Sequence, residues 1–356
     1  MVVPRVKGSS AGARSVEENV EAKLQALLNE GRAAAVDWTS TEVDFPPYLD
    51  EKKFRLGQQA FYNNVFSMML GKLTGLIALL AVPTILDIIV FTKQSGTPCT
   101  AFRRYVSTIL HTFVWYEKKP EKSSEFLLSL KNVHMKHCIA FRRSAEAGLT
   151  KASQTDMALA QFGFIGFILV CSEKLGLTCT KEELEGFVHM WRVIGYMLGM
   201  EDKYNLCTGS VEEATELCRR LLDEVFLPSF ATRSKNFDEM GRVLIEGLWP
   251  VNPHLDTKAF TAFTLHLAVT GATNNNHSLV IDTESMPRYS RFMYNLQLFA
   301  LKYLIAPTYW WAPIFRAYFN TQMRIAIFLT EKFPFLAYYC FGYRESQVNI
   351  YKYYLH

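Results

Sequence analysis

The chain has 356 residues, of which 49% are hydrophobic and 20% are charged, and its net charge is +4. Such a chain can bury one large core, whereas its weak and scattered positive charge argues against nucleic acid as the main partner. Its seven cysteines include no CxxC pair, so neither a zinc-finger framework nor a complete disulfide framework is expected. Free thiols in a reducing compartment are the simpler expectation.

The N-terminal segment predicts a polar tail followed by helices. The opening MVVPRVKGSSAGARS is basic and polar and has no apolar stretch, so we expect disorder there and no cleaved secretory signal. Apolar residues at helical spacing predict a helix over 16–32. A second helix is expected to begin after Asp50, behind the loop DFPPY.

The next segment, residues 65–91, is apolar enough to be mistaken for a membrane span. Lys72, Pro83 and Asp87 interrupt it. They leave about 14 residues free of charge, where a span needs roughly 20. We therefore interpret this segment as one or two buried core helices.

Helical periodicity continues through the middle of the chain, and no stretch alternates as a β-strand would. Gly163 and Gly166 are expected to allow a close neighbour, and Thr180 with Glu183 fits a capping box. The segment TNNNHS (273–278) is expected to be a loop. The helices are predicted over 100–116, 121–147, 154–175, 181–200, 211–225 and 236–249.

The C-terminal part, from about residue 288, is rich in aromatic and apolar side chains. Its segment 296–315 fits two structures equally well, an interfacial or re-entrant element or a core helix broken at proline. Aromatic residues lie there between two cations, a pattern typical of the membrane interface, which predicts peripheral membrane contact. These residues are Tyr309, Trp310, Trp311 and Phe315, between Lys302 and Arg316.

The predicted helix 100–116 carries one polar stripe. Arg104, Thr108, His111 and Trp115 follow one another at i, i+4, i+7 and i+11, and Ser107 lies beside them. One interpretation is a solvated helix face. The other is a polar wall inside an apolar pocket, where an arginine and a hydroxyl group hold an anionic or oxygen-bearing ligand.

The predicted helix 121–147 carries the pair His134 and His137 in the run KNVHMKHCIAFRRS. Such a pair can bind zinc, but no carboxylate or thiol completes a tetrahedral set, and Cys138 is expected to point elsewhere. A haem iron needs only one axial imidazole in an apolar slot with a polar side opposite. Ordinary core or surface histidines are the remaining alternative.

The stretch HMWRVIGYMLGMEDKYN (189–205) combines polar and small residues. His189 and Arg192 share a helix face, and Gly195 and Gly199 allow a close neighbour. Glu201 and Asp202 follow at the helix end, where negative charge opposes the dipole, so pairing with a base or plain solvation is expected. A packed helix with a polar end is the favoured interpretation.

Four motifs, read in order, resemble the MpaB and rubber-oxygenase (latex-clearing protein) family over roughly residues 45 to 230. They are SGTPCTAFRRYVSTILHTFVWY, VHMKH, QTDMALAQFGFIGFIL and FVHMWRVIGYMLGMEDKYNLC. The resemblance implies haem b and the use of O2 to cleave carbon–carbon double bonds of isoprenoids. It places the proximal iron ligand at His137, with His134 where the family usually has arginine. Arg104 and Thr108 match its distal RxxKT motif, whereas Ser107 replaces the lysine.

This resemblance predicts a single all-α domain of the rubber-oxygenase type over 46–290. A polar tail with one amphipathic helix would precede it (1–45), and an aromatic-rich helical region would follow (291–356). The implied function is a haem b-dependent oxygenase that acts on an unsaturated lipid or isoprenoid. Arg104 and Thr108 would be catalytic, by hydrogen bonds to bound oxygen or a haem propionate. His134 and His111 are further candidates at the cofactor.

Two alternatives stay open. Ser107 and His134 favour a non-catalytic haem- or lipid-binding relative at a membrane. A metal-dependent hydrolase that uses His134 and His137 is the other. Without the distal lysine, the iron is expected to be open or to hold water, with His111 as the nearest substitute ligand. An intracellular location with association to the endoplasmic-reticulum membrane is expected.

Overall fold

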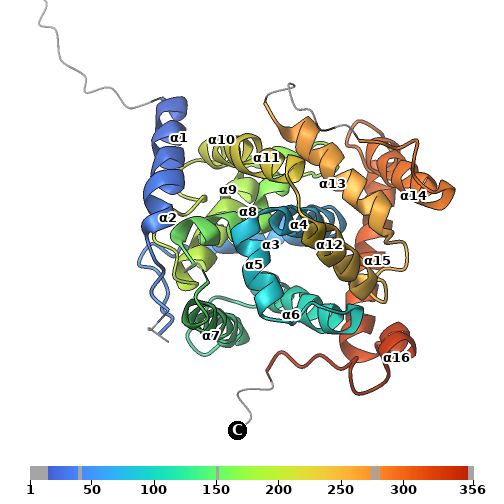
Figure 1. Ribbon diagram of the computed structural model, residues 1–356. Coiled ribbons are helices and arrows are strands. Elements are labelled where there is room, and N and C mark those ends of the chain that lie inside the picture. The colour runs from blue at the N-terminus through green and yellow to red at the C-terminus, as the bar shows by residue number, and fades with distance from the viewer. Residues whose placement is uncertain (1–14, 39–41, 150–151, 274–278, 280, 352–356) are drawn as a thin grey trace, which may run out of the picture.

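The computed structural model describes residues 15–38, 42–149, 152–273, 279 and 281–351, and its regular elements are helices (Figure 1). The part of the chain described holds no β-strand, and Ala35 and Ser153 form an isolated antiparallel bridge. The prediction of an all-α fold is therefore confirmed. The predictions for the N-terminal tail and for nearly all of the loop TNNNHS lie outside the described residues.

The helices follow one another through short connections, and three α-helices continue into a π-helical turn. The elements are α1 (Val16–Gln25), η1 (Ala26–Glu30), α2 (Gly31–Ala33), α3 (Glu51–Asn63), α4 (Val65–Ala81), α5 (Pro83–Phe91), α6 (Pro98–Glu117), α7 (Glu125–Glu146), α8 (Gln154–Val170), α9 (Lys181–Met197), α10 (Val211–Leu221), η2 (Leu222–Phe226), α11 (Leu227–Ala231), α12 (Lys235–Leu248), α13 (Thr257–Gly271), α14 (Arg288–Phe299), η3 (Ala300–Leu304), α15 (Ala312–Lys332) and α16 (Phe335–Phe341).

The helix ends follow capping chemistry that the sequence carries. The Thr97 side chain caps α6 and Pro98 occupies its first turn, so this helix starts two residues before the predicted position. The predicted capping box of Thr180 and Glu183 is confirmed at the start of α9. This helix ends at Met197 rather than residue 200, because Gly199 adopts a positive φ of 91° just beyond it.

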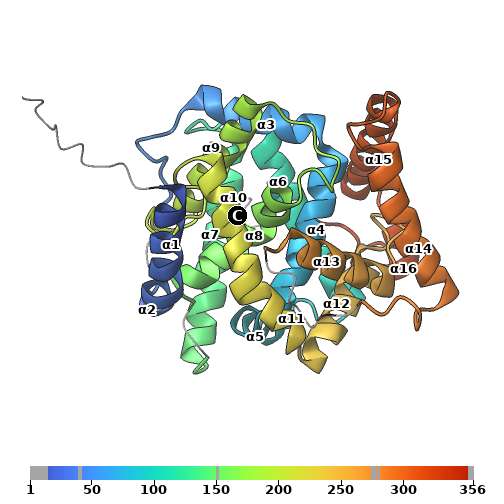
Figure 2. The ribbon, with the colours of Figure 1, turned by 90° about the horizontal axis from the view of Figure 1, so that it is seen from above.

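The apolar segment 65–91 forms two helices, α4 and α5, as predicted for a buried core element. Proline stops the first helix, since α4 ends at Ala81 and Pro83 begins α5. α4 packs against α8 near the centre of the molecule (Figure 2). A Cβ atom added to Gly75 would lie 2.0 Å from the Gly163 carbonyl oxygen, so the two backbones touch where neither residue has a side chain.

Among the described helices, no single one is long and apolar enough to cross a bilayer. α3 and α4 together meet the length and composition criteria, but they are bent by 94° relative to each other.

The C-terminal helices α14, α15 and α16 occupy one side of the molecule, at the right in both ribbon views (Figures 1 and 2). The helical run of α14 and η3 ends at Leu304, and α15 begins at Ala312 with Pro313 in its first turn. A break at the proline-containing segment is therefore present, and α15 packs on α4 of the core.

Candidate functional site

The polar stripe of α6 is turned inward rather than toward water. His111 and Trp115 are buried, and Arg104 and Thr108 are half-buried. The Thr108 hydroxyl donates to the Arg104 carbonyl oxygen at 3.2 Å, a bond within the helix. The interpretation of this stripe as a solvated helix face is therefore wrong.

α7 brings His137 next to this stripe. The Nδ1 atom of His137 is buried and has no hydrogen-bond partner. Aromatic rings surround the imidazole, with the Trp38 ring centroid at 6.3 Å and the Phe141 centroid at 5.8 Å. Since buried polar atoms in proteins are nearly always hydrogen-bonded, this nitrogen is a candidate for contact with a ligand.

Electrostatics keep this imidazole neutral. Burial, together with smaller contributions from His134, Arg104 and Lys136, lowers the pKa of His137 to about 4. At neutral pH the ring therefore carries a free lone pair. A neutral imidazole is the form of histidine that ligates a metal ion.

His111 is engaged at both ring nitrogens. Its Nδ1 lies 2.8 Å from Ser129 Oγ, and its Nε2 lies 3.5 Å from Lys136 Nζ. The ammonium group can only donate, so Nε2 accepts and Nδ1 donates to the serine oxygen. Trp115 Nε1 donates to the same oxygen at 3.0 Å. Burial, followed by the charge of Lys136, lowers the pKa of His111 to about 3, so the ring is neutral.

Two cations beside His137 lack carboxylate partners. Arg104 Nη1 donates to the neutral oxygens Thr92 Oγ1 at 3.3 Å and Ser95 Oγ at 3.2 Å. Lys136 contacts His111, and burial lowers the pKa of this lysine. Within the described ranges, neither cation forms an ion pair. This corner of the molecule is therefore able to accept an anion.

The second histidine of α7 differs from the first. His134 is buried, and its Nε2 lies 3.5 Å from Cys138 Sγ. The expectation that Cys138 points elsewhere is wrong, because residues four apart stack on one helix face. In the described part of the chain, no group of three or more His, Cys, Asp or Glu side chains could hold a metal ion. The described residues therefore provide no third ligand for a hydrolase zinc ion beside His134 and His137.

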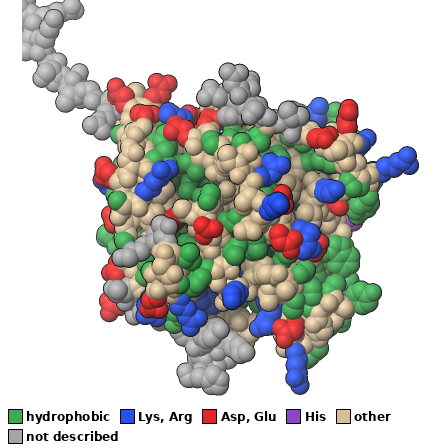
Figure 3. All heavy atoms as spheres, in the orientation of Figure 1, with side chains coloured by type: hydrophobic (Ala, Val, Ile, Leu, Met, Phe, Trp, Pro, Cys, Tyr) green, Lys and Arg blue, Asp and Glu red, His purple; other side chains and the backbone are tan. Residues whose placement is uncertain are grey.

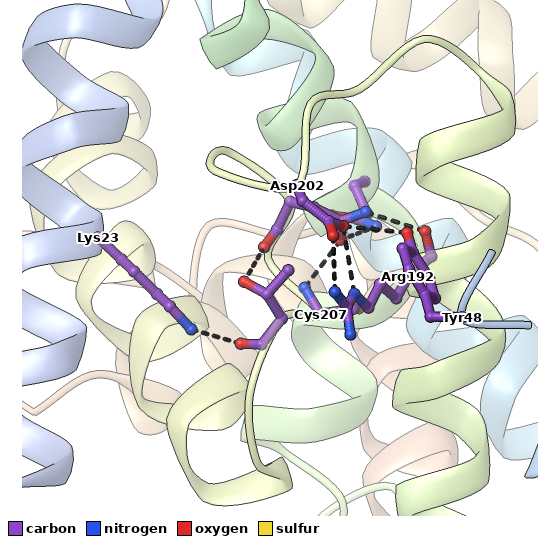
Figure 4. A network of polar contacts seen from close by, with 8 residues as sticks. Lys23, Tyr48, Arg192, Asp202 and Cys207 are labelled. Atoms are coloured by element: carbon purple, nitrogen blue, oxygen red, sulfur yellow. Dashed lines mark hydrogen bonds and ion pairs between the residues drawn. The ribbon is translucent and has the colours of Figure 1, made fainter. Parts of the chain in front are cut away.

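The polar residues at the end of α9 form a closed network (Figure 4). Arg192 pairs with Asp202 at 2.6 Å, and the Tyr48 hydroxyl donates to the same carboxylate at 3.0 Å. Burial acts to raise the pKa of Asp202, but hydrogen bonds from Arg192 and Tyr48 outweigh it and hold this pKa below its usual value. Of the two alternatives expected for this acidic end, pairing with a base is the one that holds for Asp202.

The same network fixes the loop after α9. Asn205 is buried, and its amide links the Arg192 carbonyl oxygen, the Gln161 side chain and the Cys207 amide, all at 3.0 Å. His189, at the outer edge, accepts a hydrogen bond from the Asp50 backbone at 3.1 Å. Every one of these groups has a protein partner, which agrees with the interpretation of this stretch as a packed helix with a polar end.

One cavity of the molecule lies away from these histidines. It has a volume of about 1020 Å³ between α1 and α10 and is lined mainly by charged side chains, among them Glu17, Glu21, Glu216 and Arg220. None of the predicted site residues lines it. Because its walls are charged and open to solvent, we give it no role in binding an apolar ligand.

Sequence patterns did not reveal three members of the α6–α7 site. Ser129 and Lys136 join it through hydrogen bonds to His111 from the neighbouring helix. Trp38 comes from the segment after α2, and its buried Nε1 has no hydrogen-bond partner. None of them follows a spacing rule relative to the α6 stripe, since each reaches the site through tertiary packing.

Comparison with known proteins gives a class for this arrangement. A sequence model described as "ER-bound oxygenase mpaB/B'/Rubber oxygenase, catalytic domain" matches residues 60–296, which include all of α6 and α7. This class is that of oxygenases, and hence of oxidoreductase enzymes. Because the match covers more than half of the chain, the protein belongs to the family of mpaB-type and rubber oxygenases.

A solved structure of latex clearing protein (LCP) in the closed state is also similar to the chain. The two share 15% identical residues over 90% of this chain and 93% of that one, with a TM-score of 0.49. The comparison with curated proteins gives no match.

Proposed function

We propose that this chain is a haem b-dependent oxygenase that uses O2 to oxidise or cleave carbon–carbon double bonds of an unsaturated lipid or isoprenoid. The observation that carries the proposal is the neutral imidazole of His137, whose buried Nδ1 has no partner, on a helix inside the matched oxygenase region. That nitrogen is not tied to another protein group in the described chain, so the imidazole is available as an axial ligand of haem.

The surrounding residues fit a haem in chemistry as well. A porphyrin needs flat apolar neighbours, which Trp38 and Phe141 supply beside His137. It also carries two propionates, and Arg104 and Lys136 are cations whose charge no described carboxylate neutralises. His134 already contacts Cys138, so His137 is the better ligand of the pair.

Each residue then has a definable task. Bound haem would supply the iron that binds and activates O2. His137 would hold it and set its electron density through the neutral ring. Arg104 now donates to Ser95, and Thr108 donates to the helix backbone. On binding, both would donate instead to an anionic or oxygen-bearing group of the cofactor or substrate. His111, fixed by Ser129 and Lys136, would keep a rigid polar wall beside them.

Visible absorption of protein expressed with ample haem tests the proposal. We expect a Soret band that His137→Ala abolishes and His134→Ala retains. His254→Ala, at an exposed histidine, is the matched control and should bind haem normally. A protein without a Soret band refutes haem dependence. Retention by His137→Ala with loss by His134→Ala refutes the ligand assignment.

Turnover is a separate test. Haem-loaded protein should consume O2 with an unsaturated isoprenoid such as squalene and release carbonyl products. Arg104→Ala should keep part of its haem and lose about 1.5–3 kcal/mol of stabilisation of the oxygen-bearing group, if a charge-assisted hydrogen bond is removed. Haem binding without any product from such substrates would indicate the non-catalytic, ligand-binding relative that Ser107 and His134 favour.

A further inference from the structure

We propose that the outer side of α14, α15 and α16 docks peripherally on a phospholipid bilayer that contains anionic lipids. We call this surface the aromatic face. Of the 22 large hydrophobic side chains that are exposed in the described chain, 16 lie between residues 289 and 343. Figure 3 shows hydrophobic side chains gathered at the lower right, over α15 and α16. Patches of this kind on otherwise polar proteins mark interaction sites.

The exposed apolar residues follow the helical repeat. On α15, Ile314, Tyr318, Ile325 and Phe328 are exposed, and their spacing of 4, 7 and 3 residues puts them on one stripe. The opposite side of this helix contributes buried Ile327, facing the core. A helix that is apolar on both sides fits two partners, the protein core and a second apolar phase.

α14 repeats the pattern. Its exposed residues Tyr289, Phe292, Leu296 and Phe299 are separated by 3, 4 and 3 residues and so share one side of the helix, while Met293 faces inward. Two helices that are consecutive in the chain therefore both present apolar stripes outward, on the same side of the molecule (Figures 1 and 2).

The chemistry of the most exposed residues is that of a membrane interface. Tyr339 is 87% exposed and Trp310 is 81% exposed, and Tyr303 and Tyr343 are exposed as well. Tyrosine and tryptophan concentrate at the headgroup level, because their rings are apolar while their OH and NH groups stay hydrated.

Charge selects the partner. Residues 288–351 contain seven Lys and Arg but only two Glu, a net charge of +5, whereas the rest of the chain has a net charge of −1. Such a basic region is attracted to anionic headgroups. Contact between two copies of this face would bring like charges together, so a bilayer is favoured over a homodimer.

The aromatic face is continuous with the helix of the proposed site. Phe341 of α16 packs on Phe102 of α6, with ring centroids 5.4 Å apart. Phe102 precedes Arg104 of the proposed site by two residues. Docking would thus place α6 close to the source of apolar lipids. This consequence, unlike the docking itself, rests on the proposed function.

Flotation of the full-length, haem-free protein with phosphatidylcholine vesicles, with and without phosphatidylserine, tests the docking. We expect wild type to bind both and to bind the phosphatidylserine vesicles more strongly, with high salt weakening that preference. Ile314→Asn/Ile325→Asn should lower the partition coefficient at least about tenfold, since each side chain would leave an apolar phase. Val16→Asn/Val90→Asn, at exposed residues elsewhere, should change it less than about twofold.

Fluorescence gives a second measurement on variants that keep their fold. Brominated lipids should quench wild-type tryptophan emission, and Trp310→Phe should remove most of that quenching, whereas Trp249→Phe should not. Absence of vesicle binding, or equal binding by both double variants, overturns the proposal. The proposal is also overturned if sedimentation shows that the wild type is a dimer and that Ile314→Asn/Ile325→Asn is a monomer. Because the assay needs no haem, it can fail while the Soret band is present.

Discussion

The polar side chains at the end of α9 find partners within the protein, whereas several of those between α6 and α7 do not. Asp202 is held by Arg192 and Tyr48, and the amide of Asn205 is fully used. Between α6 and α7, His137 Nδ1 and Trp38 Nε1 are buried without hydrogen bonds. In the sequence the two regions look alike, because each has histidine and arginine at helical spacing.

The difference separates structural polar clusters from binding sites. A closed network stabilises the fold and leaves no group for a ligand. A cluster with buried, unpaired donors and unneutralised cations costs free energy unless something binds to it. Substitutions in the two regions should therefore differ in what they lower. At the end of α9 they should mainly lower stability, and between α6 and α7 they should mainly lower ligand binding.

The largest effect is expected at Asn205. Asn205→Ala would leave the Gln161 amide, the Cys207 backbone N–H and the Arg192 carbonyl oxygen short of a partner in a buried place. The free energy of unfolding should fall by about 3 kcal/mol, measured by urea denaturation. Asn295→Ala, at an exposed position of α14, should change it by less than about 0.5 kcal/mol. A small loss at Asn205 would mean that the network is not what holds this loop.

Lys72 sharpens the comparison, since it is unpaired but lies outside the site. Its buried Nζ has no hydrogen bond and lies over the rings of Tyr116 at 4.3 Å and Phe61 at 5.0 Å. Burial lowers the pKa of Lys72 well below its usual value. Lys72→Met should therefore raise the free energy of unfolding by about 1–3 kcal/mol at neutral pH, because a costly buried amine becomes a thioether of similar shape.

The pH dependence of that gain follows from the sign of the shift. The unfolded chain binds a proton at Lys72 that the folded chain binds poorly, so wild-type stability rises with pH up to about 10.4. The advantage of Lys72→Met should shrink over that range, in parallel urea titrations. Lys258→Met, at an exposed lysine, should show no such trend. A gain that is constant with pH would show that Lys72 keeps its proton in the folded protein.

A smaller effect is expected for the ion pair at the end of α9. Both partners are partly exposed, with side-chain exposures of 30% and 39%, so Asp202→Asn should cost only about 0.5–1 kcal/mol. Because the pKa of Asp202 is lowered in the folded state, its contribution is present above the unfolded value of about 3.9 and is lost as pH falls through the folded value. Glu201→Gln, one residue earlier, serves as the control in acid-unfolding curves.

The positions of most helices could be predicted from the sequence, because capping residues and the spacing of apolar residues are local features. Thr180 with Glu183 marks the start of α9, and Pro83 separates α4 from α5. α13 was not predicted, because it is apolar on most sides and so lacks a clear amphipathic period. The C-terminal part was expected to be helical over 291–356, but the bounds of α14, α15 and α16 were not predicted.

The site was predicted only in part. Helical spacing brought Arg104, Thr108 and His111 onto one face, but it did not decide whether that face meets water or protein. Only the packing of α7 shows that the stripe is covered. The roles of Ser129 and Lys136 are not local, since each depends on how two helices dock across a connection.

The smallest change in stability is expected at the proposed ligand itself. In the haem-free protein, His137→Ala removes an imidazole whose Nδ1 makes no hydrogen bond, so the free energy of unfolding should fall by about 1 kcal/mol or less, through lost packing on Trp38 and Phe141. His111→Ala, in contrast, leaves Ser129 and Lys136 without their buried partner and should cost about 2 kcal/mol. Urea denaturation of both variants, beside haem titration followed at the Soret band, gives the two readouts together. If His137→Ala destabilises the haem-free protein as much as His111→Ala does, the His137 imidazole stabilises the fold. The α6–α7 region would then be a structural polar cluster like the end of α9.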